Sequence, residues 1–372
     1  MQPECPMCQM WKQRGAKFCG NCGRSLSDVP TVIVSDRPTA TVYAAGTDPE
    51  KKGPRTPSIL RLSVIICVMV VTLIVANNTI LSVAFFDRIV DDCSVLRFSF
   101  SLSYGFGDIT LFKYHGVGTA IALTLCLIVE GLFLAYALLR FFKALNREKT
   151  QADGLCVEHT GLSAASSALA VSLILSVILL SITAASGSAA DSSWMSKYTD
   201  LQMIFMLTKA GLEEEIILRL VWIGIPMMLI ALAVNKDRRS WQYLMGGFGM
   251  SKVAVILIVF SSILFGLAHL NGWGWGKVPS ATIGGLIFGY LYVEYGLYAA
   301  VLAHTANDTM TTLLYSFGQG VEVLAMLLLL LLGFVILIYW VLKATKLKNE
   351  IEGIPLFPGK LENNLLEQWG RH

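Results

Sequence analysis

Residues 209–223 read Lys209-Ala-Gly-Leu-Glu213-Glu214-Glu215-Ile-Ile-Leu-Arg219-Leu-Val-Trp-Ile, which places three carboxylates and a guanidinium in an apolar run. Ionised groups at membrane depth are costly, and they persist mainly where they pair or perform chemistry. At roughly 100° per helical residue, Glu215 and Arg219 share one helix face, so we expect them to form an ion pair. Glu214 then points to a different side of the helix and is free of that pair.

The composition is that of a membrane protein. The chain has 372 residues, of which 55% are hydrophobic and 15% charged, whereas soluble domains carry about 25% charged residues. Several apolar runs reach the roughly 20 residues that a membrane-spanning helix needs. We therefore expect an all-α polytopic membrane protein surrounded by lipid. The formal net charge of +3 is too small to argue for a nucleic-acid partner.

The apolar runs predict about eight transmembrane helices. Their expected ranges are, to within roughly two to four residues at each end, 62–86, 116–139, 162–185, 201–234, 252–270, 278–295, 297–316 and 321–343. The fourth is long enough to tilt, or to kink at Pro226. Residues 87–115 mix Asp, Phe, Ser and Gly and suit an extracytoplasmic loop.

Basic residues predict the orientation of these helices. Four groups of them fall on one side of the eight-helix arrangement: Lys51, Lys52, Arg55 and Arg61; Arg140, Lys143, Arg147 and Lys149; Lys236, Arg238 and Arg239; and Lys343, Lys346 and Lys348. Cytoplasmic loops carry the excess of Lys and Arg. We therefore expect both termini in the cytosol, with the protein in the plasma membrane.

Four cysteines near the N-terminus form two Cys-x-x-Cys pairs, Cys5 with Cys8 and Cys19 with Cys22. Two such pairs can give four thiolates to one tetrahedral Zn²⁺, and so short a segment would depend on the metal for its folding. The alternative is a pair of redox motifs. The segment resembles the short zinc ribbons fused to prokaryotic membrane proteins, which implies a prokaryotic source. We expect it to fold around structural zinc or to bind a cytosolic partner.

The chain therefore divides into four expected parts. They are a zinc ribbon (1–26), a flexible linker (27–57), an eight-helix membrane domain (58–344, with its polar motifs at 200–316) and a cytosolic tail (345–372).

Three polar constellations lie in the expected membrane helices: Glu214-Glu215-x-x-x-Arg219, Phe265-x-x-x-His269 and His304-x-x-x-Asp308. If they converge on one cavity, Glu214 can act as a general base toward water. The histidines can polarise a carbonyl, stabilise an oxyanion or hold a metal, while Asp308 orients His304 through its other ring nitrogen.

Each constellation also has a structural interpretation. A Glu–Arg pair can simply lock two helices, and a single histidine can be an interhelical hydrogen-bonding residue. Glu130 in the second helix either lines the cavity or pairs with a neighbouring helix. A non-catalytic membrane protein and a proton-coupled transporter are therefore the rival interpretations.

The three motifs, in this order on successive helices, resemble the CPBP family of intramembrane proteases, which groups CAAX prenyl endopeptidases with bacteriocin-processing and bacteriocin-immunity (Abi) proteins. The resemblance covers roughly residues 200–316. It implies a glutamate-dependent endopeptidase, described in the family as a metalloprotease, that hydrolyses peptide bonds of a membrane-associated substrate. The alternative within the family is an immunity or scaffold protein without catalysis.

Carried over by position, the resemblance implies specific roles for motif residues. The catalytic set is Glu214, Glu215, His269, His304 and Asp308, with Arg219 and Phe265 in support. Asp308 stands where many relatives carry Asn. No spacing here decides whether a catalytic metal is bound, and His269 and His304 are the residues that would hold a metal or water.

The predicted topology contains one difficulty. His269 lies near the outer end of its helix, whereas His304 lies only about 10 Å from the inner start of its own. The two can meet only if the helices tilt, if the span 278–295 is short, or if a span boundary is misplaced. A short hairpin of 278–295 and 297–316 that penetrates part of the membrane would bring them together.

Overall fold

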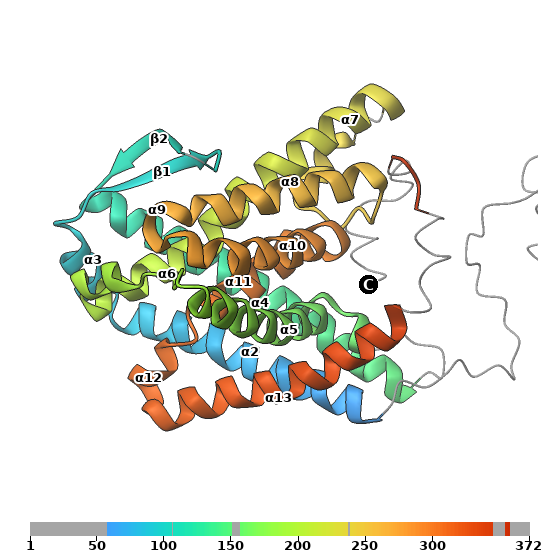
Figure 1. Cartoon of the computed structure of the whole chain (residues 1–372), viewed down its shortest axis with the longest axis horizontal. Coiled ribbons are helices and arrows are strands. Elements are labelled where there is room, and N and C mark those ends of the chain that lie inside the picture. Colours follow the sequence, from blue (N-terminus) through green and yellow to red (C-terminus); the bar gives the residue numbers. More distant parts are fainter. Residues whose placement is uncertain (1–57, 106, 151–156, 237–238, 345–353, 358–372) are drawn as a thin grey trace, which may run out of the picture. The chain divides into compact units, whose positions relative to one another are not determined.

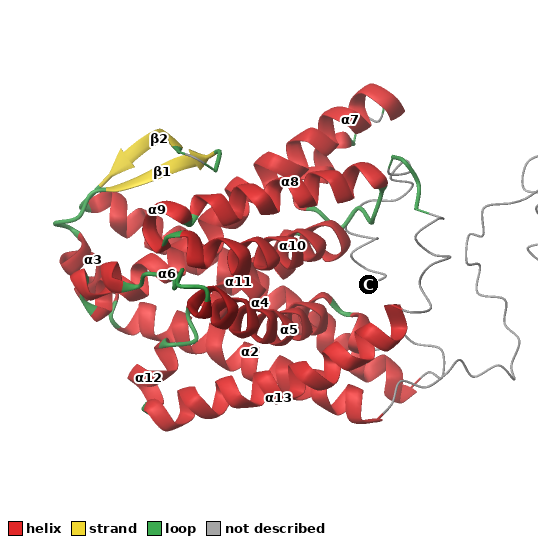
Figure 2. Cartoon of the chain, viewed as in Figure 1, coloured by secondary structure: helices red, strands yellow, loops and turns green. Residues whose placement is uncertain are grey.

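The computed structural model describes residues 58–105, 107–150, 157–236, 239–344 and 354–357. These residues form a bundle of helices with a two-stranded hairpin at one end (Figures 1 and 2). The expected zinc ribbon with Cys5, Cys8, Cys19 and Cys22, the linker and most of the tail lie outside the described residues.

Six of the described helical segments are long and apolar enough to cross a membrane. They are α2 (Ser58–Ala84), α4 (Val117–Thr150), α5 (Gly161–Ala185), the continuous stack of α6 (Asp200–Glu215), η3 (Ile216–Gly224) and α7 (Ile225–Asn235), α8 (Lys252–Ala268) continued by α9 (Leu270–Trp273), and α13 (Gln319–Ala344). At 1.5 Å per residue, the 27 residues of α2 reach about 40 Å, beyond the roughly 30 Å hydrocarbon core. The chain is therefore a mostly helical, polytopic membrane protein, although the expected count of eight spans is not confirmed.

The last polar motif lies on a short helix in the centre of the bundle. The expected span 297–316 is divided into α11 (Leu297–Asp308) and α12 (Thr312–Phe317), and α10 (Val278–Tyr295) precedes it. The 12 residues of α11 reach only about 18 Å. Its residues from Leu297 to Ala306 are all buried, against α4, α5, α6 and α10.

The fourth expected span is irregular immediately after its acidic residues. Residues Ile216–Gly224 form a π-helix, and the N–H of Ile225 binds the carbonyl of Leu220 rather than that of Val221. Pro226 follows directly and has no N–H to donate. The helix is therefore widened just before Pro226, the position at which the sequence allows a kink, and such π-helical turns are frequent at functional sites.

The loop predicted at residues 87–115 has regular structure. It contains α3 (Phe86–Cys93) and an antiparallel hairpin of β1 (Phe98–Ser103) and β2 (Asp108–Tyr114). Phe98 pairs with Tyr114 and Ser103 with Asp108, with a bulge between Phe100 and Ser101. The alternation of apolar and serine residues in β1 is the period of a strand with two different faces.

A glycine brings α6 and α11 into close contact. A Cβ placed on Gly211 would lie 2.4 Å from the hydroxyl oxygen of Thr305 and 2.9 Å from its Cα. Small residues of this kind allow two membrane helices to approach closely. This contact carries Glu214 and Glu215 to the helix that bears His304.

The two ends of the bundle are assembled from different segments. One end, at the right in Figure 1, brings together the start of α2, the ends of α4, α7 and α13 and the start of α8. At this end Arg61 binds Glu148, and the N–H of Lys252 binds the carbonyl of Pro355. The opposite end holds α3, the hairpin, α9 and α12 (Figure 1). Four short turns complete the loops: η1 (Val157–His159), η2 (Ser193–Lys197), η4 (Ser240–Met245) and η5 (Trp275–Lys277).

Candidate active site

Glu215 is the centre of a fully buried polar network. One of its carboxylate oxygens accepts from Nε of Arg219 at 3.0 Å, and the other lies 2.8 Å from Nδ1 of His304. The carboxylate of Glu215 and the guanidinium of Arg219 are both completely inaccessible to solvent. The ion pair expected from the sequence is therefore present, and it also holds a histidine from another helix.

Arg219 joins this network to α8. Its Nη1 donates to the hydroxyl of Ser261 at 2.8 Å, and that hydroxyl donates to the carbonyl of Leu218 at 2.6 Å. The guanidinium carbon lies 5.5 Å from the ring centre of Phe265, a cation–π distance. Removing the Arg219 cation would leave the buried Glu215 carboxylate with His304 as its remaining partner.

The imidazole ring of His304 has partners both at its ring nitrogens and on its face. Its ring stacks on Phe288 at 4.7 Å between centres. Its Nε2 lies 3.4 Å from Asp308 and 3.7 Å from Glu214. Both ring nitrogens of His304 therefore lie beside carboxylates.

The partners of His304 differ from those expected. Glu215, rather than Asp308, contacts Nδ1 of His304, the ring nitrogen on the side away from Glu214. Asp308 lies on the same nitrogen as Glu214, because it follows His304 by one helical turn toward the open side. Asn307 donates to the other oxygen of Asp308 at 3.0 Å.

Glu214 faces a cavity of about 550 Å³ instead of the buried network. Its side chain is 34% exposed, and one of its carboxylate oxygens is buried without a hydrogen-bond partner among the described residues. As the pairing argument predicts, Glu214 is free of Arg219.

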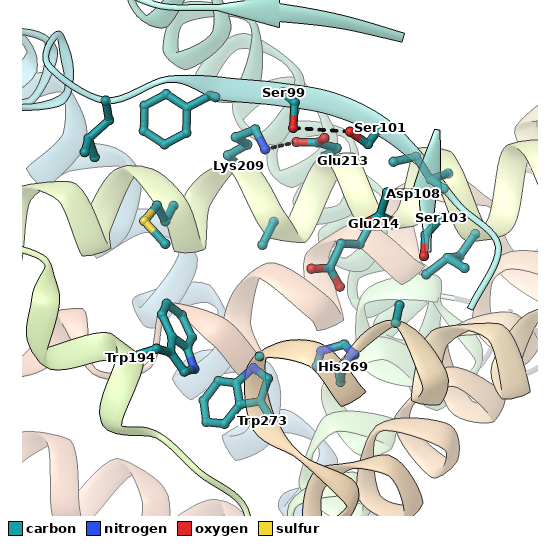
Figure 3. A pocket seen from close by; sticks show the side chains of 18 of the residues that line it. Ser99, Ser101, Ser103, Asp108, Trp194, Lys209, Glu213, Glu214, His269 and Trp273 are labelled. Atoms are coloured by element: carbon teal, nitrogen blue, oxygen red, sulfur yellow. Dashed lines mark hydrogen bonds and ion pairs between the residues drawn. The ribbon is translucent and has the colours of Figure 1, made fainter. Parts of the chain in front are cut away.

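His269 lies on the opposite wall of the same cavity, facing Glu214 (Figure 3). Its Nδ1 lies 2.9 Å from the carbonyl oxygen of Phe265. A carbonyl only accepts, so the Nδ1 atom of His269 carries a proton. The Phe265 ring lies between the two histidines, 4.8 Å from His269 and 5.6 Å from His304. The three motifs thus converge, because α11 is short and central.

The hairpin forms one wall of the cavity, a feature absent from the sequence-based expectation. Strand β1 contributes three serines that line it, and α9 and η2 contribute Trp273 and Trp194. Glu213 also lines the cavity: it pairs with Lys209 and accepts a hydrogen bond from the backbone of Ser101 (Figure 3). Glu213 thus links the hairpin to α6.

Glu130 adds a further buried acid behind α11. It is inaccessible to solvent and accepts from the hydroxyl of Thr305 at 3.3 Å. It does not line the cavity, so of the two interpretations that the sequence allows, contact with a neighbouring helix describes its position.

The histidines do not supply a complete set of metal ligands. Among the described residues, no three His, Cys, Asp or Glu side chains are placed to hold a metal ion. Nδ1 of His304 is occupied by Glu215 and Nδ1 of His269 by the Phe265 carbonyl. The reaction considered below therefore uses the residues of the chain alone.

Comparison with known proteins identifies the segment that holds these residues. A family model described as Type II CAAX prenyl endopeptidase Rce1-like matches residues 198–310. The searches of curated proteins and of solved structures found no match. The matched segment contains Glu214, Glu215, Arg219, His269, His304 and Asp308, while α2 to α5, the hairpin and α13 lie outside it. Residues 198–310 therefore form an Rce1-like domain of the CAAX prenyl endopeptidase (CPBP) family.

Proposed function

We propose that the chain is a glutamate-dependent intramembrane endopeptidase that hydrolyses peptide bonds of membrane-associated polypeptides. One observation carries the proposal. Glu214 and His269, from different helices, line the same cavity, and Glu214 also approaches Nε2 of His304 at 3.7 Å. A general base, a second polar group and a buried ion-paired network then lie together, as peptide hydrolysis requires.

In the proposed reaction, the carboxylate of Glu214 removes a proton from water as the water oxygen attacks the carbonyl carbon of the substrate. The protonated Glu214 then returns this proton to the amide nitrogen as the carbon–nitrogen bond breaks. Glu214 is available for this role, because it lines the cavity and its side chain is 34% exposed.

The two histidines have different tasks in this scheme. The lone pair on Nε2 of His269 accepts a hydrogen bond from the attacking water and positions it. The Nε2–H of His304 supplies a fixed positive dipole beside Glu214, close to where the oxyanion develops. Glu215 and Arg219 hold that ring in place through the bonds at 2.8 and 3.0 Å.

The cavity also has polar groups suited to a polypeptide backbone. The hydroxyl of Ser103 and the indole nitrogen of Trp194 are buried without hydrogen-bond partners in the described structure, and both residues line the cavity. Buried polar atoms normally find partners. The N–H and C=O groups of a bound peptide can supply them.

The test replaces Glu214 by Gln, which keeps the shape of the side chain and removes its charge. New peptide termini are compared between membranes that contain the wild-type protein and membranes that contain Glu214→Gln. We expect the termini produced by the wild type to disappear in the variant. Glu322→Gln, the same change at the start of α13 and away from the cavity, serves as the control.

Two results would contradict the enzyme. Unchanged termini in Glu214→Gln would remove Glu214 from the reaction. Absence of any new terminus with the folded wild-type protein would favour the rival function, a non-catalytic binding or immunity protein of the same family.

We also propose that Cys5, Cys8, Cys19 and Cys22 bind one structural zinc ion in the cytosol, where a partner can contact the ribbon. The measurement is the zinc content of the full chain and of a chain that begins at Ser58. We expect one equivalent in the full chain and none in the shorter one. Zinc retained by the shorter chain would place the metal elsewhere.

A further inference from the structure

The basic residues of the bundle gather at one of its ends. In the described part of the chain, this basic end carries Arg61, Arg140, Lys143, Arg147, Lys236, Arg239, Lys252 and Lys343, on the segments that meet at the right in Figure 1. The opposite end, called here the hairpin end, carries the smaller set Arg88, Arg97, Lys113, Lys197 and Lys277. By the rule that cytoplasmic ends carry the excess of Lys and Arg, the basic end faces the cytosol.

The cavity is built from the hairpin end. Its lining comes from β1 and its flanks, η2, α6, the start of η3, the end of α8, and α9. Trp194 and Trp273 pack at its rim with ring centres 5.3 Å apart, and Trp275 follows them, exposed. Tryptophans gather where a membrane meets water, so these residues mark the hairpin end as an interface.

The depth of Glu214 follows from a contact between α2 and α6. Asn78 lies six residues before the end of α2 at Ala84, and its side chain binds Thr208 at 3.0 Å. Glu214 lies six residues farther along α6. Each of these two six-residue steps spans about 9 Å at 1.5 Å per residue. Glu214 therefore lies about 18 Å from the end of α2, measured toward the basic end, near the middle of the bundle. A cavity must therefore connect it to water.

On the cytosolic side of the site, the described side chains are packed. Residues Leu297–Ala303 of α11 are all buried, as are Phe288 and Tyr292 of α10. Tyr292 closes this side further, because its hydroxyl lies 2.9 Å from the carbonyl oxygens of both Tyr243 and Leu244 and donates its one proton there. The lining of the cavity runs from the hairpin end to the middle of the bundle, and it includes no described residue from the segments that meet at the basic end.

We propose that the active site opens to the extracytoplasmic face, and that its substrates are polypeptide segments exposed on that face of the membrane. This inference rests on the proposed endopeptidase function for its substrate class, but not for the direction of the opening. The substrates would then differ from those of an enzyme that cleaves prenylated C-termini, because prenylated C-termini lie on the cytosolic face of the membrane. The hairpin end would then receive a segment that has already crossed the membrane.

The direction is tested with cysteine variants of the full chain in intact cells, using a sulfonated maleimide that does not cross membranes. Gly272→Cys probes the cavity, since a Cβ there meets no atom within 4 Å and the residue is exposed. Lys343→Cys, exposed in the last turn of α13, is the matched probe of the basic end. The unsubstituted chain gives the background from its own cysteines.

We expect Gly272→Cys to be labelled equally in intact and in permeabilised cells, and Lys343→Cys only after permeabilisation. The reverse pattern, or labelling of both in intact cells, would overturn the inference. If Gly272→Cys fails to fold, Ser192→Cys, exposed beside η2 at the same end, gives the same two outcomes.

The substrate class has its own readout. The peptide termini that depend on Glu214 are assigned to the membrane face of the parent protein, and we expect extracytoplasmic segments. Termini on cytosolic segments, including prenylated C-terminal peptides, would overturn the inference while preserving the endopeptidase. Absence of Glu214-dependent termini would overturn the endopeptidase, and the labelling would still decide which face the cavity opens to.

Discussion

Glu214 and Glu215 are neighbours on one helix, yet they occupy opposite kinds of environment. Glu215 is inaccessible to solvent and has a partner on each carboxylate oxygen, whereas Glu214 faces the cavity with one oxygen unpartnered. The difference shows how one helical turn can supply both a rigid support and a reactive group. Because each carboxylate oxygen of Glu215 already has a partner, Glu215 can fix His304 without competing for the reacting atoms of the proposed reaction.

The strongest test of this contrast removes the support. Arg219→Met keeps much of the side-chain volume and leaves Glu215 buried without its cation. Breaking a buried ion pair costs about 3–5 kcal/mol, so we expect a large fall in the free energy of unfolding, measured by denaturant titration in detergent micelles. Glu214, by contrast, faces the cavity and not the buried network. We therefore expect Glu214→Gln to change the free energy of unfolding by less than about 1 kcal/mol.

Glu215→Gln combined with Arg219→Met is the control, because it removes both charges of the pair. We expect the double variant to be more stable than Arg219→Met alone, since no carboxylate is then left without its cation. If Arg219→Met and Glu214→Gln destabilise the protein equally, the division between a supporting acid and a reactive acid is wrong.

A smaller effect is expected where the supporting helices touch. Gly211→Ala places a methyl group 2.4 Å from the hydroxyl oxygen of Thr305 and against its backbone, so α6 and α11 must separate. Overpacking of this kind costs about 1–3 kcal/mol, and we expect lower thermal stability and lower peptidase activity together.

Gly131→Ala on α4 is the matched variant, because a Cβ there meets no atom within 4 Å. Alanine favours a helix over glycine by about 1 kcal/mol, so this variant should be as stable as the wild type or more so. Equal behaviour of the two alanine variants would show that α6 and α11 do not depend on close contact.

The smallest expected effect lies on the cavity side. Lys209→Met removes the partner of Glu213, at a pair whose side chains are 20% and 12% exposed. Partly exposed ion pairs contribute about 0.2–1 kcal/mol, so we expect little change in the unfolding transition. The hairpin should loosen from α6, measurable as faster hydrogen exchange in β1. Unaltered exchange there would mean that other contacts hold the hairpin.

The sequence predicts the residues of the site well and their bonds less well. The i, i+4 spacing of Glu215 and Arg219 suffices to separate Glu214 from the pair, because it depends only on helix geometry. The bond between Glu215 and His304 joins residues 89 positions apart. It depends on how α6 packs against α11, which local spacing cannot reveal.

The missed hairpin had a readable signal. Phe98-Ser-Phe-Ser-Leu-Ser alternates with a period of two, and Gly105 and Gly107 stand between the two strands, the pattern of a strand followed by a turn. The position of the hairpin over the cavity was not readable, because it depends on tertiary contacts such as that between Trp222 and the carbonyl of Ser103 at 3.1 Å.

The central position of α11 has a consequence for the order in which the protein is made. Its 12 residues are too few to cross the roughly 30 Å hydrocarbon core, and His304 and Asp308 would be costly in lipid. A newly synthesised α11 is therefore stable only after α4, α5 and α6, which precede it in the chain, have enclosed it. Since His304 approaches Glu214 only then, an unfinished chain lacks this arrangement, and the endopeptidase activity proposed above would arise only in the completed bundle.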